Sequence, residues 1–343
     1  MKYPPANLYP TNASMSVSRP RTLARVSLTT CWPLACILVV STIWPSDGRG
    51  QTSPGGQVVN TEWANLFIDC RGEGSPTVVF EAGVGAWSAA WRHVRDRVAE
   101  QTRACVYDRA GYGSSGPGSG PRDVESIATE LHMLLAAQER SPFVLVGHSF
   151  GGWVTRVYAH RYPDQVAGLV LIESAHEHQW GRLPPTIREL YDASLPGMVA
   201  RADSARAGQL EVESVLPHRF YSSRAPLWSE YRQEMIDPDH HQTVVDEVRS
   251  MDRSAGQVAR TGPLGDLPLG VVSSAREFDA YRGTPIPIAE ANRIWLELQD
   301  ELAGLSGNMV HVVSKTGTHT LQFEEPELLA GVVLEVVARA RAH

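Results

Sequence analysis

Apolar runs alternate with amphipathic segments along the first half of the chain, a pattern that predicts strands followed by helices. The expected strands cover residues 61–70, 76–83, 102–108, 143–147 and 166–174. Helices are expected at residues 90–101 and 151–162, and around an apolar face formed by Ile127, Leu131, Leu134 and Leu135. Continuous apolar strands that alternate with helices predict an α/β fold, in which a mostly parallel sheet has helices on both faces.

This alternation stops after residue 175 and resumes near residue 266. Residues 176–265 are rich in charged residues, Ser and Pro, with helical patches, several aromatics and no convincing strand. Long insertions of this kind are commonly ordered lids. We therefore expect a helical cap at 176–265, inserted between two parts of one α/β core at 52–175 and 266–343.

Residues 1–51 differ from the remainder of the chain. Arg19, Arg21 and Arg25 precede an apolar run at residues 31–43, and polar residues with Pro and Gly follow it. This order is typical of a secretory signal, and the apolar run is shorter than the roughly 20 residues that span a bilayer. A secreted or periplasmic protein is expected, with no stable membrane span once the signal is removed. An uncleaved N-terminal anchor is the alternative.

The charge of the chain limits its partners. Its 343 residues carry a formal net charge of −7, and without the first fifty residues 26 basic and 37 acidic residues remain, a net of −11. An acidic protein without basic runs is not expected to bind nucleic acid.

Four cysteines are present, and Cys31 and Cys36 belong to the N-terminal apolar run. Cys70 and Cys105 remain, each within an expected strand. In an exported chain two such cysteines favour one disulfide, and two buried thiols are the alternative.

The segment FVLVGHSFGGW, residues 143–153, places Ser149 between Gly147 and Gly151. A strand that turns sharply into a helix holds the turn residue in a strained conformation, and small residues two positions before and after it avoid clashes. The G-x-S-x-G pattern, with a strand before it and a helix after it, predicts a nucleophile elbow that presents Ser149.

A serine nucleophile needs a base and an acid that orients the base. His319 lies between the last expected strand and the last expected helix, at the same edge of the sheet as Ser149, and is the expected base. The spacing of His176, His178, His240 and His241 in the insertion matches no metal site. Glu173 closes a fully apolar strand and is the preferred acid; Asp279 is the alternative and Glu277 ranks third.

A serine hydrolase also needs an oxyanion hole, in which backbone N–H groups bind the developing negative charge. Phe150 supplies one N–H group at the start of the helix after the serine. Val84, in the glycine-containing loop EAGVGAW at residues 81–87, is the expected second donor. A phosphate-binding loop is disfavoured, because this loop has neither the G-x-G-x-x-G spacing nor a P-loop lysine.

Four motifs occur in order along residues 60–340, namely EAGVGAW, YDRAGYGSS, GHSFGG and GTHTLQFEEPE. With them the chain resembles the α/β-hydrolase superfamily, and most closely its bacterial exported serine hydrolases. The resemblance implies a Ser–His–acid triad, a helical cap and an acid at the end of the strand that Glu173 closes. Haloalkane dehalogenases and epoxide hydrolases look similar, but they require a carboxylate where this chain has Ser149.

The expected function is hydrolysis of a small or medium acyl substrate, a carboxylic ester, through an acyl-enzyme and without a cofactor. Amide, lactone or carbon–carbon bond hydrolysis on the same triad stays open. A small-molecule receptor with a slow or inactive triad is the alternative from another functional class.

Overall fold

The computed structural model describes residues 55–138, 140–212 and 228–342 of the chain. The predicted export signal at residues 1–51 lies outside these residues.

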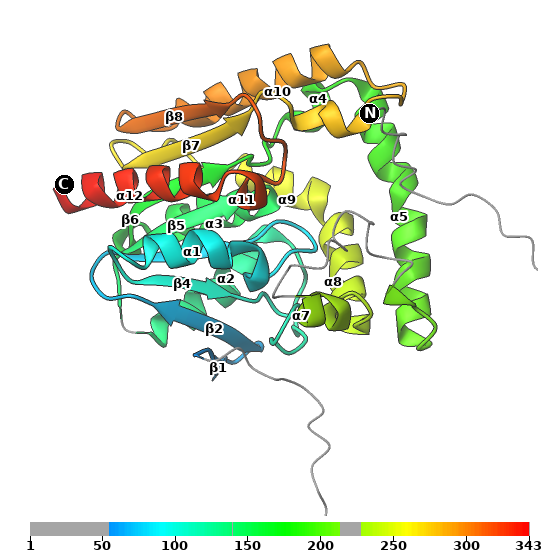
Figure 1. The fold of residues 1–343 in the computed structure, drawn as a ribbon, viewed down its shortest axis with the longest axis horizontal. Coiled ribbons are helices and arrows are strands. Elements are labelled where there is room, and N and C mark those ends of the chain that lie inside the picture. The colour runs from blue at the N-terminus through cyan, green and yellow to red at the C-terminus, as the bar shows by residue number, and fades with distance from the viewer. Residues whose placement is uncertain (1–54, 139, 213–227, 343) are drawn as a thin grey trace, which may run out of the picture. The chain divides into compact units, whose positions relative to one another are not determined.

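The described strands form one sheet in the order β1-β2-β4-β3-β5-β6-β7-β8 (Figure 1). Their bounds are β1 Gln57–Asn60, β2 Asn65–Arg71, β3 Thr77–Glu81, β4 Ala104–Tyr107, β5 Phe143–His148, β6 Val166–Ile172, β7 Leu269–Ser274 and β8 Met309–Ser314. β2 runs antiparallel to β1 and β4, and every other neighbouring pair is parallel. The predicted mostly parallel α/β sheet is confirmed.

Helices cover both faces of the sheet. Helices α1 (Arg92–Val98) and α12 (Pro326–Ala342) pack on one face and lie in front of the sheet in Figure 1. Helices α2 (Val124–Ala136), α3 (Phe150–Arg161) and α9 (Met251–Val258) contribute to the apolar cluster on the other face. The strands serve both clusters, because successive side chains of a strand point to opposite faces.

Strand β3 shows this alternation in its packing. Val78 and Phe80 belong to the cluster of α1 and α12, whereas Val79 belongs to that of α2 and α3. All three side chains are fully buried. Because both faces of this strand are covered by helices, its central side chains are all apolar, which explains the continuous apolar run in the sequence.

The elements described between β6 and β7 are helices, joined by loops. They are α4 (Gln179–Arg182), α5 (Pro185–Arg206), α7 (Trp228–Glu234), α8 (Pro238–Arg249) and α9. In Figure 1, α5, α7 and α8 lie beyond the end of the sheet to which β7 points. Helix α9 is different, because its Met251, Ala255 and Val258 pack in the core beside α2 and α3. We use "cap" below for α5, α7 and α8.

Shorter helical elements and α10 complete the described chain. They are η1 Ser88–Trp91, η2 Pro163–Gln165, η4 Glu277–Tyr281, α10 Ile288–Ala303 and α11 Leu321–Glu324. The face of α10 that the sequence marks as apolar is buried, with Ala291, Trp295 and Leu298 in one cluster with Phe278 of η4.

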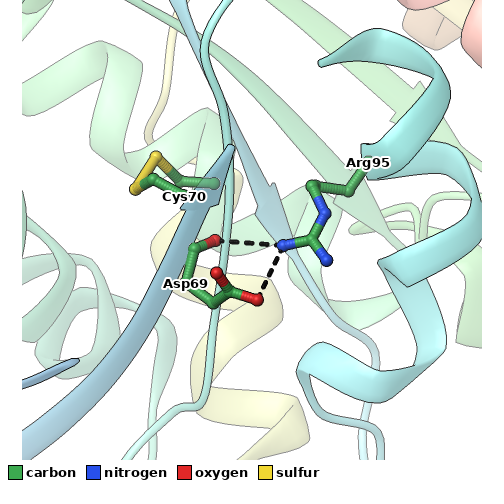
Figure 2. The surroundings of a disulfide bond; sticks show 4 residues. Asp69, Cys70 and Arg95 are labelled. Atoms are coloured by element: carbon green, nitrogen blue, oxygen red, sulfur yellow. Dashed lines mark hydrogen bonds and ion pairs between the residues drawn. A yellow bond between two sulfur atoms is a disulfide. The ribbon is translucent and has the colours of Figure 1, made fainter. Parts of the chain in front are cut away.

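A disulfide joins Cys70 of β2 to Cys105 of β4, which face each other in the antiparallel ladder. Beside it, Asp69 points away from Cys70 and meets Arg95 of α1, as Figure 2 shows. The Arg95 guanidinium lies 2.9 Å from the Asp69 carboxylate, and both side chains are buried. A covalent bond and a buried ion pair thus tie the antiparallel edge of the sheet to its neighbours.

Within the described parts of the chain, no helix is both long enough and apolar enough to span a lipid bilayer.

Candidate active site

Ser149 forms the turn between β5 and α3, where the sequence predicts the elbow. Ser149 has φ 53° and ψ −122°, a backbone conformation that costs a non-glycine residue free energy. Its backbone N–H donates to Ile172 of β6, and its carbonyl accepts from Gly152 and Ala175. These bonds hold the strained residue where β5 and β6 end.

The two elbow glycines are needed because the backbone is crowded there. A Cβ atom on Gly147 would lie 2.5 Å from the carbonyl oxygen of Gly151. A Cβ atom on Gly151 would lie 2.5 Å from the carbonyl oxygen of Ala82. The sharp turn therefore also brings the loop after β3 against the start of α3.

This loop carries the predicted oxyanion donor. A Cβ atom on Gly83 would lie 3.2 Å from Cβ of Ser149, so the loop backbone packs directly on the serine. Val84 follows Gly83 and is half-buried. Phe150 begins α3, and the first N–H groups of a helix have no partner within the helix. The structure thus brings Val84, Ser149 and Phe150 into one neighbourhood.

His319 lies between β8 and α11, and two carboxylates approach its Nδ1 atom. Glu277 is 3.0 Å away and Glu173 is 3.8 Å away. The histidine side chain is 37% exposed, whereas that of Glu173 is fully buried. With Nδ1 facing the carboxylates, Nε2 is the ring nitrogen that remains for a serine hydroxyl.

The pKa values of these two carboxyl groups shift in opposite directions. Burial raises the pKa of Glu173 well above its ordinary value, and the neighbouring charge of Glu277 raises it further. The pKa of Glu277 is lowered, because His319 and the hydrogen bond from Glu173 outweigh its burial. Like charges in contact cannot both ionise. These opposite shifts favour the charge on Glu277, the carboxyl group that lies nearer to the imidazole.

Glu173 is held firmly at the end of β6. Its carboxyl group accepts from the backbone N–H of Ser274 at 2.5 Å and from Nε1 of Trp295 at 3.2 Å. Its φ of 45° is the other positive value among described non-glycine residues besides that of Ser149. Strained residues cluster at functional sites, and here each one directly follows one of the neighbouring parallel strands β5 and β6.

Asp279, the alternative acid, lies elsewhere. Its carboxylate accepts from Arg276 at 3.0 Å, from Arg282 at 2.9 Å and from Asn292 at 3.2 Å. The structure thus brings Glu173 and Glu277 to the histidine and directs Asp279 to an arginine pair. Of the acids weighed from the sequence, the one ranked third is nearest to His319.

His148 is a site residue whose contacts were not anticipated from the sequence. Its Nε2 lies 2.8 Å from the carbonyl oxygen of His319, and the two rings are 4.7 Å apart. Since a carbonyl only accepts, Nε2 carries the proton and donates. Burial, followed by the charge of His319, lowers the pKa of His148 to about 3. A neutral His148, the residue that precedes Ser149, thus binds the loop that carries His319.

Glu173, Glu277 and His319 also place one ligand atom each within 4.8 Å of one another. A carboxylate pair on a histidine has this spacing whenever it orients the ring. We therefore assign this cluster to the hydrogen bonding of His319.

The family model described as "alpha/beta hydrolase fold" matches residues 76–259, more than half of the chain. A curated relative, "Probable transporter efuK" of Hormonema carpetanum, is 27% identical over 296 residues. That match covers 79% of this chain and 40% of the relative, so the chain spans less than half of the relative's length.

Two solved structures share the fold at low identity. A variant of a proposed epoxide hydrolase from Pseudomonas aeruginosa is 19% identical, with a TM-score of 0.64 over 84% of this chain and 97% of that one. An esterase from Exiguobacterium antarcticum is 14% identical, with a TM-score of 0.60 over 80% of this chain and 96% of that one. These likenesses agree with the family match and with the motifs in the sequence, and the chain belongs to the α/β hydrolase fold family.

Proposed function

We propose that this protein is a serine hydrolase that cleaves carboxylic esters with small or medium acyl groups. The observation that carries the proposal is a strained Ser149 whose neighbour His148 bonds to the His319 carbonyl, with Nδ1 of His319 3.0 Å from Glu277. A strained turn exposes the hydroxyl, and a carboxylate on Nδ1 leaves Nε2 as the base.

In the first half of the reaction, Ser149 Oγ attacks the ester carbonyl carbon while its proton passes to Nε2 of His319. The carbonyl oxygen becomes an oxyanion, to which the backbone N–H groups of Val84 and Phe150 donate. The tetrahedral intermediate collapses, the C–O bond to the alcohol breaks, and the imidazolium returns the proton to the leaving alkoxide. An acyl group then remains on Ser149.

In the second half, a water molecule gives a proton to His319 and attacks the acyl carbon. The acid leaves and Ser149 regains its proton. No cofactor takes part in this scheme.

We assign the acid role to Glu277, with Glu173 as the neutral carboxyl group behind it. The shorter distance to Nδ1 and the lowered pKa of Glu277 support this order. It differs from the sequence-based preference for Glu173 alone. A charged group in contact with the imidazole stabilises the imidazolium that forms in each half-reaction.

We also propose that the protein works outside the cytoplasm. The Cys70–Cys105 disulfide supports this location, since such bonds persist in oxidising compartments. The signal-like pattern of residues 1–51 supports it as well.

The test is hydrolysis of p-nitrophenyl acetate and butyrate by the purified protein beside Ser149→Ala, with Ser204→Ala on α5 as the matched serine control. We expect Ser149→Ala to lose about 10³-fold or more in kcat/KM and Ser204→Ala to keep its activity. Labelling by a p-nitrophenyl phosphonate should add one phosphonyl group, on Ser149.

Labelling without ester turnover would show a reactive Ser149 whose substrate is not a simple ester. Hydrolysis of an amide, a lactone or a carbon–carbon bond would then be the proposed reaction. If the protein shows neither phosphonate labelling nor ester turnover, the hydrolase proposal is overturned and a small-molecule receptor is favoured.

A further inference from the structure

Arg109 lies just after β4, and its side chain is 2% exposed. Its guanidinium donates to the carbonyl oxygen of Ala82 at 2.5 Å and to that of Gly83 at 2.8 Å. Both carbonyls belong to the loop that carries Val84. A buried arginine thus binds two successive peptide groups of the oxyanion loop.

Binding a carbonyl also fixes the N–H group of the same peptide bond. A trans peptide is planar, so its C=O and N–H groups point in opposite directions. The Gly83 carbonyl and the Val84 N–H belong to one such unit. With the carbonyl held by Arg109, the Val84 N–H is fixed on the side opposite Arg109, and the peptide cannot flip without breaking this bond.

The next turn of the loop is held by the same group of side chains. The backbone N–H of Gly85 donates to the Tyr112 hydroxyl at 3.2 Å, and that hydroxyl donates to Glu247 at 2.8 Å. Glu247 also accepts from Nε of Arg109 at 2.9 Å. Peptide groups on both sides of Val84 are therefore anchored to one buried network.

The network reaches from the sheet into the cap. Glu81, at the end of β3, pairs with Arg109 at 2.6 Å and accepts from the Tyr107 hydroxyl. Glu247 belongs to α8 in the cap, and its side chain is fully buried. Arg109 is thus the common partner of a core carboxylate, a cap carboxylate and the oxyanion loop.

The charges support a permanently ionised arginine. Burial opposes the charge of Arg109, but the Glu247 and Glu81 carboxylates outweigh it and raise the arginine pKa further. Removing Arg109 would leave two buried carboxylates without their cation.

From this geometry we propose that Arg109 is the positioning residue of the oxyanion loop, and that Glu247 makes its position depend on the seating of cap helix α8. This inference rests on the proposed serine hydrolase function. Arg109 does not touch the substrate in this proposal; it acts through the Val84 N–H group.

Two variants test the proposal in the full chain. Arg109→Lys keeps the charge but loses the planar fork that reaches two carbonyls and two carboxylates. Glu247→Gln keeps the size of the side chain and leaves the Arg109 bonds to the loop carbonyls available. Arg95→Lys and Asp69→Asn are matched controls, since Arg95 of α1 and Asp69 of β2 form another buried ion pair, at 2.9 Å.

The measurements are kcat and KM for p-nitrophenyl butyrate, the Ki of phenylboronic acid, and the Ki of an ether analogue of the ester. A boronic acid adds to Ser149 Oγ as a tetrahedral adduct with an oxygen in the oxyanion hole, whereas the ether forms no adduct. We expect Arg109→Lys to lower kcat about 10²-fold and Glu247→Gln about 10-fold, with KM within about 3-fold.

The Ki of the boronic acid should rise with the loss in kcat, while the Ki of the ether stays unchanged. Thermal unfolding of all four variants separates this effect from a loss of folding, and Glu247→Gln decides the matter if Arg109→Lys does not fold. The proposal is overturned if both variants keep kcat and boronic acid affinity within about 3-fold of the unmodified protein. An unmodified protein without ester turnover or boronic acid binding overturns the function and this inference together.

Discussion

Glu277 approaches Nδ1 of His319 to 3.0 Å, although the two residues come from different loops after β7 and β8. Glu173 stands behind this contact, at 3.8 Å from the same nitrogen. The base thus faces two carboxyl groups whose pKa values shift in opposite directions, upward for the buried Glu173 and downward for Glu277. These shifts underlie the predictions for the two acids and for the pH–rate profile.

Replacing the two acids by amides should have unequal effects on activity. Glu277→Gln removes the charge that orients and stabilises the imidazolium, and we expect kcat to fall by about 10²-fold or more. Glu173→Gln mimics the neutral carboxyl group that the raised pKa of Glu173 favours, and kcat should stay within about 3-fold. Steady-state kinetics with p-nitrophenyl butyrate measure both values. A larger loss in Glu173→Gln than in Glu277→Gln would return the acid role to Glu173.

The acid limb of the pH–rate profile should lie at a higher pH than the ordinary histidine pKa of about 6.5. Burial opposes the charge of His319, but the Glu277 and Glu173 carboxylates outweigh it and raise the pKa of this imidazole. A protonated imidazole cannot accept the Ser149 proton, so kcat/KM rises as pH increases through this pKa.

In Glu277→Gln the acid limb should move to lower pH by about 1 unit or more, since a stabilising charge is gone. The measurement is kcat/KM from pH 5 to pH 10 in both proteins. Identical acid limbs would show that Glu277 does not act on His319 in the free enzyme.

Acid should destabilise the fold through His148. Its folded pKa is about 3, below the unfolded value of about 6.5, so protons favour the unfolded chain. The stability that a neutral His148 preserves is complete above pH 6.5 and is lost progressively as pH falls toward 3, by about 1.4 kcal/mol per unit. His148→Gln keeps a donor for the His319 carbonyl and removes this titration.

Urea unfolding at pH 7.0, 5.5 and 4.5 tests this prediction. The unmodified protein should lose more stability than His148→Gln over this range. Equal losses in the two proteins would mean that His148 is already protonated in the folded state.

The elbow should not accept a side chain at Gly147. The added Cβ would lie 2.5 Å from the Gly151 carbonyl oxygen, and we expect Gly147→Ala to cost about 1–3 kcal/mol of stability as the backbone shifts, together with most of the activity. Gly256→Ala is the matched control in α9, since its Cβ meets nothing within 4 Å. There alanine should stabilise by about 0.5–1 kcal/mol through its helix propensity. Thermal unfolding and ester hydrolysis measure both effects, and a fully active Gly147→Ala would contradict the crowding described here.

Local sequence determined the framework of this protein. The apolar runs of the parallel strands, the amphipathic face of α10 and the glycine spacing around Ser149 can be recognised in windows of a few residues, because periodicity and turn motifs are local patterns. The placement of Ser149 at the end of β5 and of His319 in the loop after β8 followed from the same local patterns.

The tertiary structure decided which groups meet at the site. Glu173, Glu277 and Asp279 all follow strands at one edge of the sheet, and the sequence does not tell in which direction the turn at η4 sends the last two. The bond from His148 to His319 spans 171 positions and that from Arg109 to Glu247 spans 138. Such contacts depend on the order of the strands and on the packing of the cap, which no local stretch of sequence specifies. Only folding brings these polar groups into one buried site, where each needs a hydrogen-bond or ion-pair partner.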